Sequence, residues 1–188
     1  MNNKALKITK VIKIAILSLG FLLNGLIFIN PAFSQTIQSV ANQLKSAQDL
    51  SLWFNKEFRY ETEMPDRWQS AEETLRLKKG DCEDFAILSK ELLGRKGIKG
   101  DIVVIKFQGV NQSHAIFIFK EGKYFSFISN KQLIQTNSPT LAGAIQEQFP
   151  DWEKITFATA KKEAVKVVLR NNHSGNTQLE SDVASDIR

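Results

Sequence analysis

The sequence predicts an α+β domain in which the helices come first and an antiparallel sheet follows. Between residues 35 and 95, apolar side chains recur at helical spacing, with polar and charged residues between them. From residue 100 onward the pattern changes to short β-branched and aromatic runs separated by glycine or polar turns. The helix that starts at Cys82 carries an apolar stripe, and we expect it to pack on the sheet.

The first 34 residues have the features of an export signal. Four lysines without acids come before an apolar stretch from Ile14 to Ile29, and Ala32-Phe33-Ser34 matches the small-x-small pattern of a cleavage site. We therefore expect residues 1–34 to be a signal peptide, with an uncleaved membrane anchor as the alternative. The protein is then exported, either to the periplasm or out of the cell, and it contacts the membrane only if the leader is uncleaved.

Polar caps and breakers divide the helical half. Residues 35–58 hold one or two helices, for which Asp49 or Ser51 is a candidate cap. A proline-containing loop separates them from a short helix that begins at Ser70. Asp81 is expected to cap the next helix, which continues to the following pair of glycines.

The second half consists of short strands and one short helix. Strands are expected at 102–107, 114–119, 123–128, 155–159 and 164–169, and the helix at 139–149. The composition becomes polar and acidic from Asn171, so residues 171–188 are expected to form a disordered tail. The domain then spans residues 35–170, a length that suits a single core.

Charge and cysteine content exclude some classes of function. The chain carries a net charge of +5, but four of its lysines belong to the leader, so the mature chain is near +1. Nucleic acid is therefore not expected as a partner, and we expect a monomer. The single cysteine rules out an internal disulfide, so an exported chain holds a free thiol that is either buried or used.

Cys82 and His114 are the minimum equipment for thiol chemistry, a nucleophile and its base. Cys82 follows a Gly-Asp turn on the first turn of a helix, where free backbone N–H groups stabilise a thiolate and, during attack, an oxyanion. His114 lies on a predicted strand. The alternatives are a small buried hydrophobic residue for the cysteine and a strand histidine satisfied by a neighbour.

A base needs a third group to orient it, and the hairpin after His114 limits the choice. A two-residue turn places Ser129 opposite His114, whereas a three-residue turn places Asn130 there. Neither side chain is a carboxylate. Asn130 can offer an amide oxygen to the imidazole, so it is the candidate third catalytic residue.

Several segments resemble the transglutaminase-like cysteine-protease superfamily, and within it the bacterial transglutaminase-like cysteine proteinases. The resemblance covers roughly residues 54–133. In order, it rests on the tryptophan segment 68–73, the nucleophile motif GDCEDFA at 80–86, the helix end 92–98 and the histidine strand 113–117. It implies a papain-like α+β fold and a Cys-His-Asp triad, with Cys82 as nucleophile and His114 as base. Ser129-Asn130 stands where the family has Asp, so Asn130 is a partial match.

The resemblance also implies a metal site and a groove residue. The proteinase branch is known for calcium bound by acids beside the nucleophile, and Asp81, Glu83 and Asp84 match that pattern. No cofactor is required for the reaction itself. The alternative for these acids is a helix cap followed by two solvated acids at a helix N-terminus. Trp68 is a candidate substrate-binding residue, with a core aromatic as the alternative.

These features favour an exported thiol hydrolase, a cysteine peptidase or amidase that acts through a Cys82 thioester. Its substrate is expected to be a protein or peptide in the periplasm or at the cell envelope. One alternative is a protein-glutamine acyltransferase, which forms the same acyl-enzyme but passes it to an amine. Another is a catalytically weak domain that binds peptide or cell-wall material, because the usual carboxylate is missing.

Overall fold

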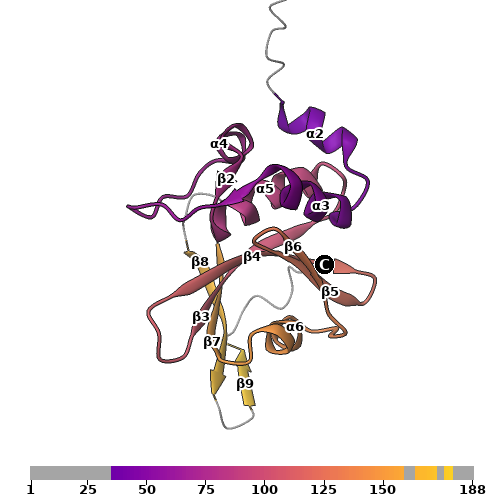
Figure 1. The fold of residues 1–188 in the computed structure, drawn as a ribbon. Helices are drawn as coiled ribbons and strands as arrows, with labels where there is room; N and C mark the ends of the chain where they lie inside the picture. Colours follow the sequence, from indigo (N-terminus) through magenta and orange to yellow (C-terminus); the bar gives the residue numbers. More distant parts are fainter. Residues whose placement is uncertain (1–34, 159–163, 173–175, 180–188) are drawn as a thin grey trace, which may run out of the picture. The chain divides into compact units, whose positions relative to one another are not determined.

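The structure of the protein is a computed structural model that describes residues 35–158, 164–172 and 176–179 (Figure 1). The predicted signal peptide, residues 1–34, lies outside the described residues, as does most of the predicted tail. Among the helices that are described, none is both long and apolar enough to span a membrane.

The helices cluster in the first half of the chain, as the apolar spacing predicts. They are α2 (Ile37–Gln43), α3 (Ala47–Glu57), α4 (Ala71–Leu77), α5 (Cys82–Gly94) and, in the second half, α6 (Leu141–Gln148). The expected caps of α3 are wrong: Ser46 is the cap, and its hydroxyl accepts the N–H of Asp49 at 3.1 Å. Ser51 lies inside the helix, where its hydroxyl donates to the carbonyl of Lys131 at 2.9 Å.

The strands form one large antiparallel sheet and one small parallel pair. The sheet is ordered β6-β5-β4-β3-β7-β8-β9, and the pair is β1-β2. The bounds are β1 (Arg59–Tyr60), β2 (Lys79–Gly80), β3 (Gly100–Phe107), β4 (Ser113–Glu121), β5 (Tyr124–Ser129), β6 (Gln132–Gln135), β7 (Trp152–Ala158), β8 (Ala164–Asn172) and β9 (Asn176–Leu179). The predicted α+β class is confirmed.

A hydrophobic core lies on each face of the large sheet. Figure 1 shows α2 to α5 gathered on one side and α6 on the other. The predicted stripe of α5 is buried, since Phe85, Leu88 and Leu92 are fully enclosed in the first core. The rings of Phe54 and Phe85 meet edge to face at 5.2 Å, which joins α3 to α5. The nucleophile helix is thus fixed against the sheet, as expected.

The polar tail is partly structured, which corrects the expected disorder from residue 171. The strand β8 continues to Asn172, and β9 pairs with it in the register Leu169↔Leu179. A polar segment can form such a strand because the backbone of β8 supplies the hydrogen-bonding partners, whatever the side chains are. Composition alone therefore overstates the disorder here.

Candidate active site

The segment before the nucleophile is held by the small parallel pair. The N–H of Arg59 donates to the carbonyl of Lys78 at 3.0 Å, and the N–H of Glu61 donates to that of Gly80 at 2.9 Å. Cys82 follows directly as the first residue of α5, as the Gly-Asp-Cys motif predicts. Two segments about 20 residues apart along the chain therefore fix the entry to the helix.

Asp84, within the first turn of α5, fixes the start of the helix through hydrogen bonds of its side chain. Its carboxylate is fully buried and accepts the N–H of Gln69 at 2.8 Å and the N–H of Asp81 at 3.2 Å. A Cβ at Gly80 would lie 2.5 Å from the Asp84 carboxylate, so only glycine fits there. Burial raises the pKa of Asp84 to about 6. Asp84 is thus occupied by backbone groups, which is a different role from the predicted metal ligand.

The Cys82 thiol lies between α5 and β4. It donates to Oε2 of Glu83 at 3.1 Å, while the N–H of Ala115 donates to the sulfur. Burial raises the pKa of Cys82 to about 12, and the negative charges of Glu83 and Asp81 add to this effect. Burial and two acids thus act against the thiolate that the helix N-terminus was expected to favour.

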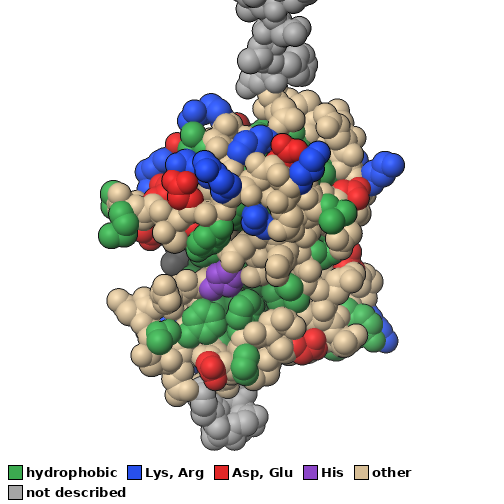
Figure 2. Space-filling model, viewed as in Figure 1, with side chains coloured by type: hydrophobic (Ala, Val, Ile, Leu, Met, Phe, Trp, Pro, Cys, Tyr) green, Lys and Arg blue, Asp and Glu red, His purple; other side chains and the backbone are tan. Residues whose placement is uncertain are grey.

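His114 stands on β4, next to the residue whose N–H contacts the sulfur. Its Nε2 lies 2.8 Å from the hydroxyl of Ser129, and its ring packs on Phe149 with centroids 5.6 Å apart. Figure 2 shows the histidine surface bordered by hydrophobic side chains. Burial lowers the pKa of His114 from its ordinary value. With Nε2 engaged by Ser129, Nδ1 is the ring nitrogen that this hydrogen bond leaves available.

The third position goes to Ser129 rather than Asn130. The β4–β5 turn is Gly122-Lys123, and the register Ile116↔Ser129 makes Ser129 the diagonal neighbour of His114 on the same face. The strand register differs by two residues from that of the expected two-residue turn and by one from that of the expected three-residue turn, so neither expected opposite pair forms. Asn130 instead occupies the β5–β6 turn with φ of 52°, a conformation that asparagine tolerates.

The acids near the nucleophile form a cluster that sequence reasoning saw only in part. The carboxyls of Asp81 and Glu83 share a hydrogen bond, and Asp66 bonds to Glu83. The negative charge of Glu63 also acts on Asp81. Burial, followed by these hydrogen bonds, raises the pKa of Glu83 to about 8. Glu63 and Asp66 were missed, although the acid-rich loop from 61 to 66 is visible in the sequence.

The carboxylates of this cluster repel one another, and a hard cation bound between them would offset that repulsion. Oδ1 of Asp81 is buried without a hydrogen-bond partner. Ligand atoms of Asp81, Cys82 and Glu83 lie within 4.8 Å of one another, and calcium prefers the carboxylate oxygens among them. Of the predicted ligands, Asp81 and Glu83 thus belong together, and Asp84 does not.

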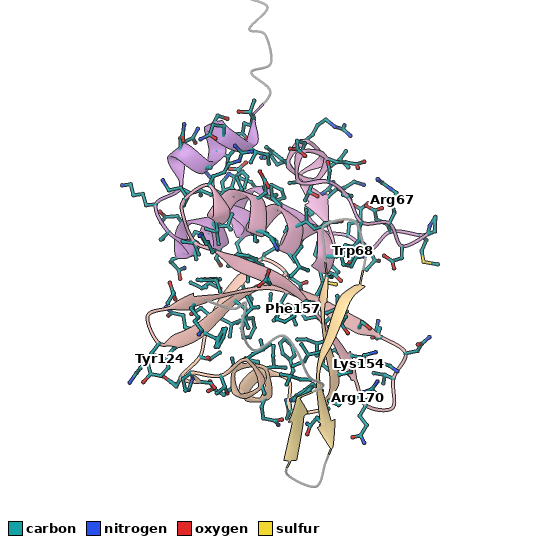
Figure 3. The ribbon with its side chains drawn as sticks, turned by 180° about the vertical axis from the view of Figure 1, so that it is seen from behind. Arg67, Trp68, Tyr124, Lys154, Phe157 and Arg170 are labelled. Atoms are coloured by element: carbon teal, nitrogen blue, oxygen red, sulfur yellow. The ribbon has the colours of Figure 1, made fainter. Side chains whose placement is uncertain are left out.

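The loop before α4 frames the site. Trp68 is half-buried and packs against the core on the α5 side of the sheet, so its predicted part in substrate binding stays a prediction. Figure 3 shows Arg67 and Trp68 on this loop, and Arg67 forms a two-pronged ion pair with Glu73 at 2.9 Å. Tyr60 is exposed on β1, and the charge of Cys82 contributes to its raised pKa, after burial.

Comparison with known proteins identifies a related family. The sequence matches the family described as a transglutaminase-like domain over residues 32–157. Solved structures of Legionella pneumophila LapG are similar. The calcium-bound form has 18% identity and a TM-score of 0.43, covering 77% of this chain and 86% of that one. The EGTA-treated form has 20% identity and a TM-score of 0.42, covering 65% and 84%. No curated protein matches the sequence.

Proposed function

The chain belongs to the transglutaminase-like domain family, and on that premise we propose that it is an exported cysteine peptidase or amide hydrolase. One observation carries the proposal: the Cys82 sulfur accepts the N–H of Ala115, the residue beside His114. The thiol at the N-terminus of α5 and the imidazole on β4 thus come from separate elements that meet at neighbouring residues of one strand. Export remains a prediction from residues 1–34.

The reaction begins with proton transfer from the thiol to Nδ1 of His114. The sulfur attacks the substrate carbonyl, and backbone N–H groups at the start of α5 stabilise the oxyanion. The imidazolium then protonates the leaving amine, which leaves a thioester on Cys82. Water hydrolyses the thioester and restores the thiol.

Ser129 has the role of orienting the imidazole. If Nε2–H donates to its hydroxyl, Nδ1 is unprotonated and is available as a base. A hydroxyl carries no charge, so it stabilises the imidazolium less than a carboxylate would. The proposed enzyme is therefore slower than a relative with an aspartate in this position.

Calcium is a proposed accessory ion and not a reactant. Asp81 and Glu83 would hold it, and when bound it would supply positive charge that offsets the acids beside the thiol. Removing the negative field of these acids favours the thiolate, because both Glu83 and Asp81 contribute to the raised pKa of Cys82.

A catalytically weak binding domain is the second candidate. The observations that favour it are the hydroxyl in place of a carboxylate at His114 and the thiol pKa of about 12. In this case the domain would hold a peptide at the same site without turnover.

Peptide-library cleavage tests the proposal. The mature chain from Gln35 and a Cys82→Ser variant would each be incubated with a tryptic peptide library and calcium, and new N-termini would be identified by mass spectrometry. We expect new termini with the wild type alone. Peptide retention by both proteins without new termini would favour the binding domain. Incorporation of a fluorescent primary amine, in place of new termini, would indicate acyl transfer.

A further inference from the structure

The turn that follows Ser129 is held by α3 through hydrogen bonds between residues far apart in the chain. The hydroxyl of Ser51 donates to the carbonyl of Lys131 at 2.9 Å and accepts the N–H of Leu133 at 3.1 Å. Ser51 is 6% exposed, which limits competition from water. Figure 1 shows α3 beside β6, the strand that contains Leu133. One buried hydroxyl therefore ties the β5–β6 turn and the start of β6 to the helix.

Two further contacts hold the same turn. The side-chain amide of Asn55 donates to the carbonyl of Lys131 at 3.2 Å, so this carbonyl accepts hydrogen bonds from two side chains of α3. The Lys131 ammonium in turn donates to the carbonyl of Phe58 at 3.2 Å, at the C-terminal end of α3, where a cation is favourable. We call Ser51, Asn55 and Lys131 the turn clamp. Its contacts are spread over about two turns of one helix.

Covering a sheet edge explains part of this arrangement. In the described sheet β6 is the outermost strand on its side, so the N–H of Leu133 meets the Ser51 hydroxyl where a further strand would pair. Serine in a helix interior commonly bonds back to its own helix, and Ser46 already caps α3. Both hydrogen bonds of the Ser51 hydroxyl lead instead to the turn or to the strand after it.

The turn clamp acts next to the residue that orients the imidazole. Ser129 is the last residue of β5 and pairs with Gln132, so residues 130–131 form the turn. Oγ of Ser129 lies 2.8 Å from Nε2 of His114. A shift of the turn would move Ser129, whereas the His114 ring is restrained by Phe149, with centroids 5.6 Å apart. The hydrogen bond would then lengthen and weaken, because the ring cannot follow the turn.

We propose that Ser51 is a positioning residue: by holding the β5–β6 turn, it keeps the Ser129 hydroxyl on Nε2 of His114 and leaves Nδ1 available as the base. The proposal deepens the function proposed above and rests on it for the meaning of turnover. The tautomer of His114 can be observed without turnover, so the two proposals can fail separately.

Nitrogen-15 NMR of the imidazole tests the positioning step directly. The chain has two histidines, so an H173Q background leaves His114 as the one imidazole observed, and its nitrogen shifts report which nitrogen carries the proton. We expect mainly the Nε2–H tautomer at a pH where the ring is neutral. S51A should shift the ring toward a mixture of the two tautomers. N55A, at an exposed position, should shift it less.

S126A is the matched control. Ser126 carries a buried hydroxyl on the same strand, three residues before Ser129, and it bonds to Glu121 and not to α3. This variant loses one hydrogen bond of the same kind but should leave the tautomer unchanged. An equal change in S51A and S126A, or no change in S51A, would overturn the proposal. If S51A does not fold, N55A decides, and an unchanged tautomer there would overturn it.

A double-mutant cycle shows whether Ser51 acts through Ser129. With a peptide identified from the library, S51A should lower kcat by about three- to tenfold and leave KM within about twofold, because the base is misplaced and substrate binding is not. On an S129A background, S51A should have no further effect on kcat or on the tautomer, and a further loss of similar size would overturn the proposal. A tautomer change in S51A together with failed library cleavage would leave the turn clamp standing and refute the peptidase.

Discussion

Both halves of the candidate site favour the neutral form of their titratable group, the Cys82 thiol in one and the His114 imidazole in the other, but their surroundings differ. The Cys82 half is rich in charge, with acids from the 61–66 loop and from α5 around the thiol. The His114 half is apolar and neutral, with Phe149 against the ring and one hydroxyl at Nε2. Negative charge and burial hold the proton on sulfur, while burial disfavours it on the imidazole. We therefore expect activity to require that the negative charge around Cys82 be offset. The maximal rate is then limited by the uncharged surroundings of His114, which stabilise the imidazolium weakly.

Removing the nucleophile should have the largest effect. We expect C82A to lower peptide turnover by at least about a thousandfold, because no other thiol is present to form the thioester. The variant should fold, since the cysteine occupies only a partly buried position. Turnover measured with any peptide identified from the library checks this, and residual activity near wild type would contradict the mechanism.

Removing the buried Asp84 carboxylate, which holds the start of α5, should have the second largest effect. D84A leaves two backbone N–H groups without their acceptor, so the free energy of unfolding should fall by about 2–3 kcal/mol. Urea unfolding measures the loss. E72A, which removes an exposed acid from α4, should change stability by less than about 0.5 kcal/mol. Equal effects of the two variants would show that the buried carboxylate does not lock the helix entry.

The acid cluster should make the protein less stable as pH rises. Glu83 has a pKa of about 8 in the folded chain against an ordinary 4.5, so the folded state holds its proton longer than the unfolded state does. Its contribution is full below pH 4.5 and is lost as pH rises to about 8. In EGTA, the loss should be on the order of 2 kcal/mol. E83Q should flatten this slope, and an unchanged slope would contradict the assignment.

Placing a carboxylate beside His114, at position 129, should have the smallest of these effects. S129D places an acid at Nε2 of His114, so it should raise the imidazole pKa and increase turnover by about tenfold. N130D is the matched control, because Asn130 belongs to the neighbouring turn. NMR titration of His114 and the pH profile of turnover measure both effects. A gain in N130D instead of S129D would restore the role first expected for Asn130.

The sequence predicted what depends on local pattern. The Gly-Asp-Cys turn, the helix after it and the strand of His114 all follow from residues close together in the chain. The identity of the residue beside His114 depended on the turn. Gly122-Lys123 is displaced by one residue from the expected two-residue turn, which shifts the register by two residues and keeps Ser129 on the face of His114. Ser129 was one of two alternatives, and pattern alone did not choose between them.

What escaped prediction depends on segments that meet only in the fold. Asp66 approaches Glu83, and Glu63 approaches Asp81, because the β1–β2 pair brings the 61–66 loop beside the start of α5. The helix dipole is a local property and was predicted, whereas burial of the thiol against β4 was not. Burial is the largest contribution to the pKa of Cys82, and it acts against the thiolate that the local argument favoured.

The ends of the large sheet have a consequence for self-association. Its outermost strands, β6 and β9, are each four residues long. Short edges offer few free backbone groups to another chain, and Asn176, Thr177 and Gln178 give one edge a polar sequence. Behind that edge, β8 carries the apolar run 167–169. A chain truncated before residue 176 would leave the edge of β8 unpaired. We therefore expect such a chain to aggregate more readily than the full chain.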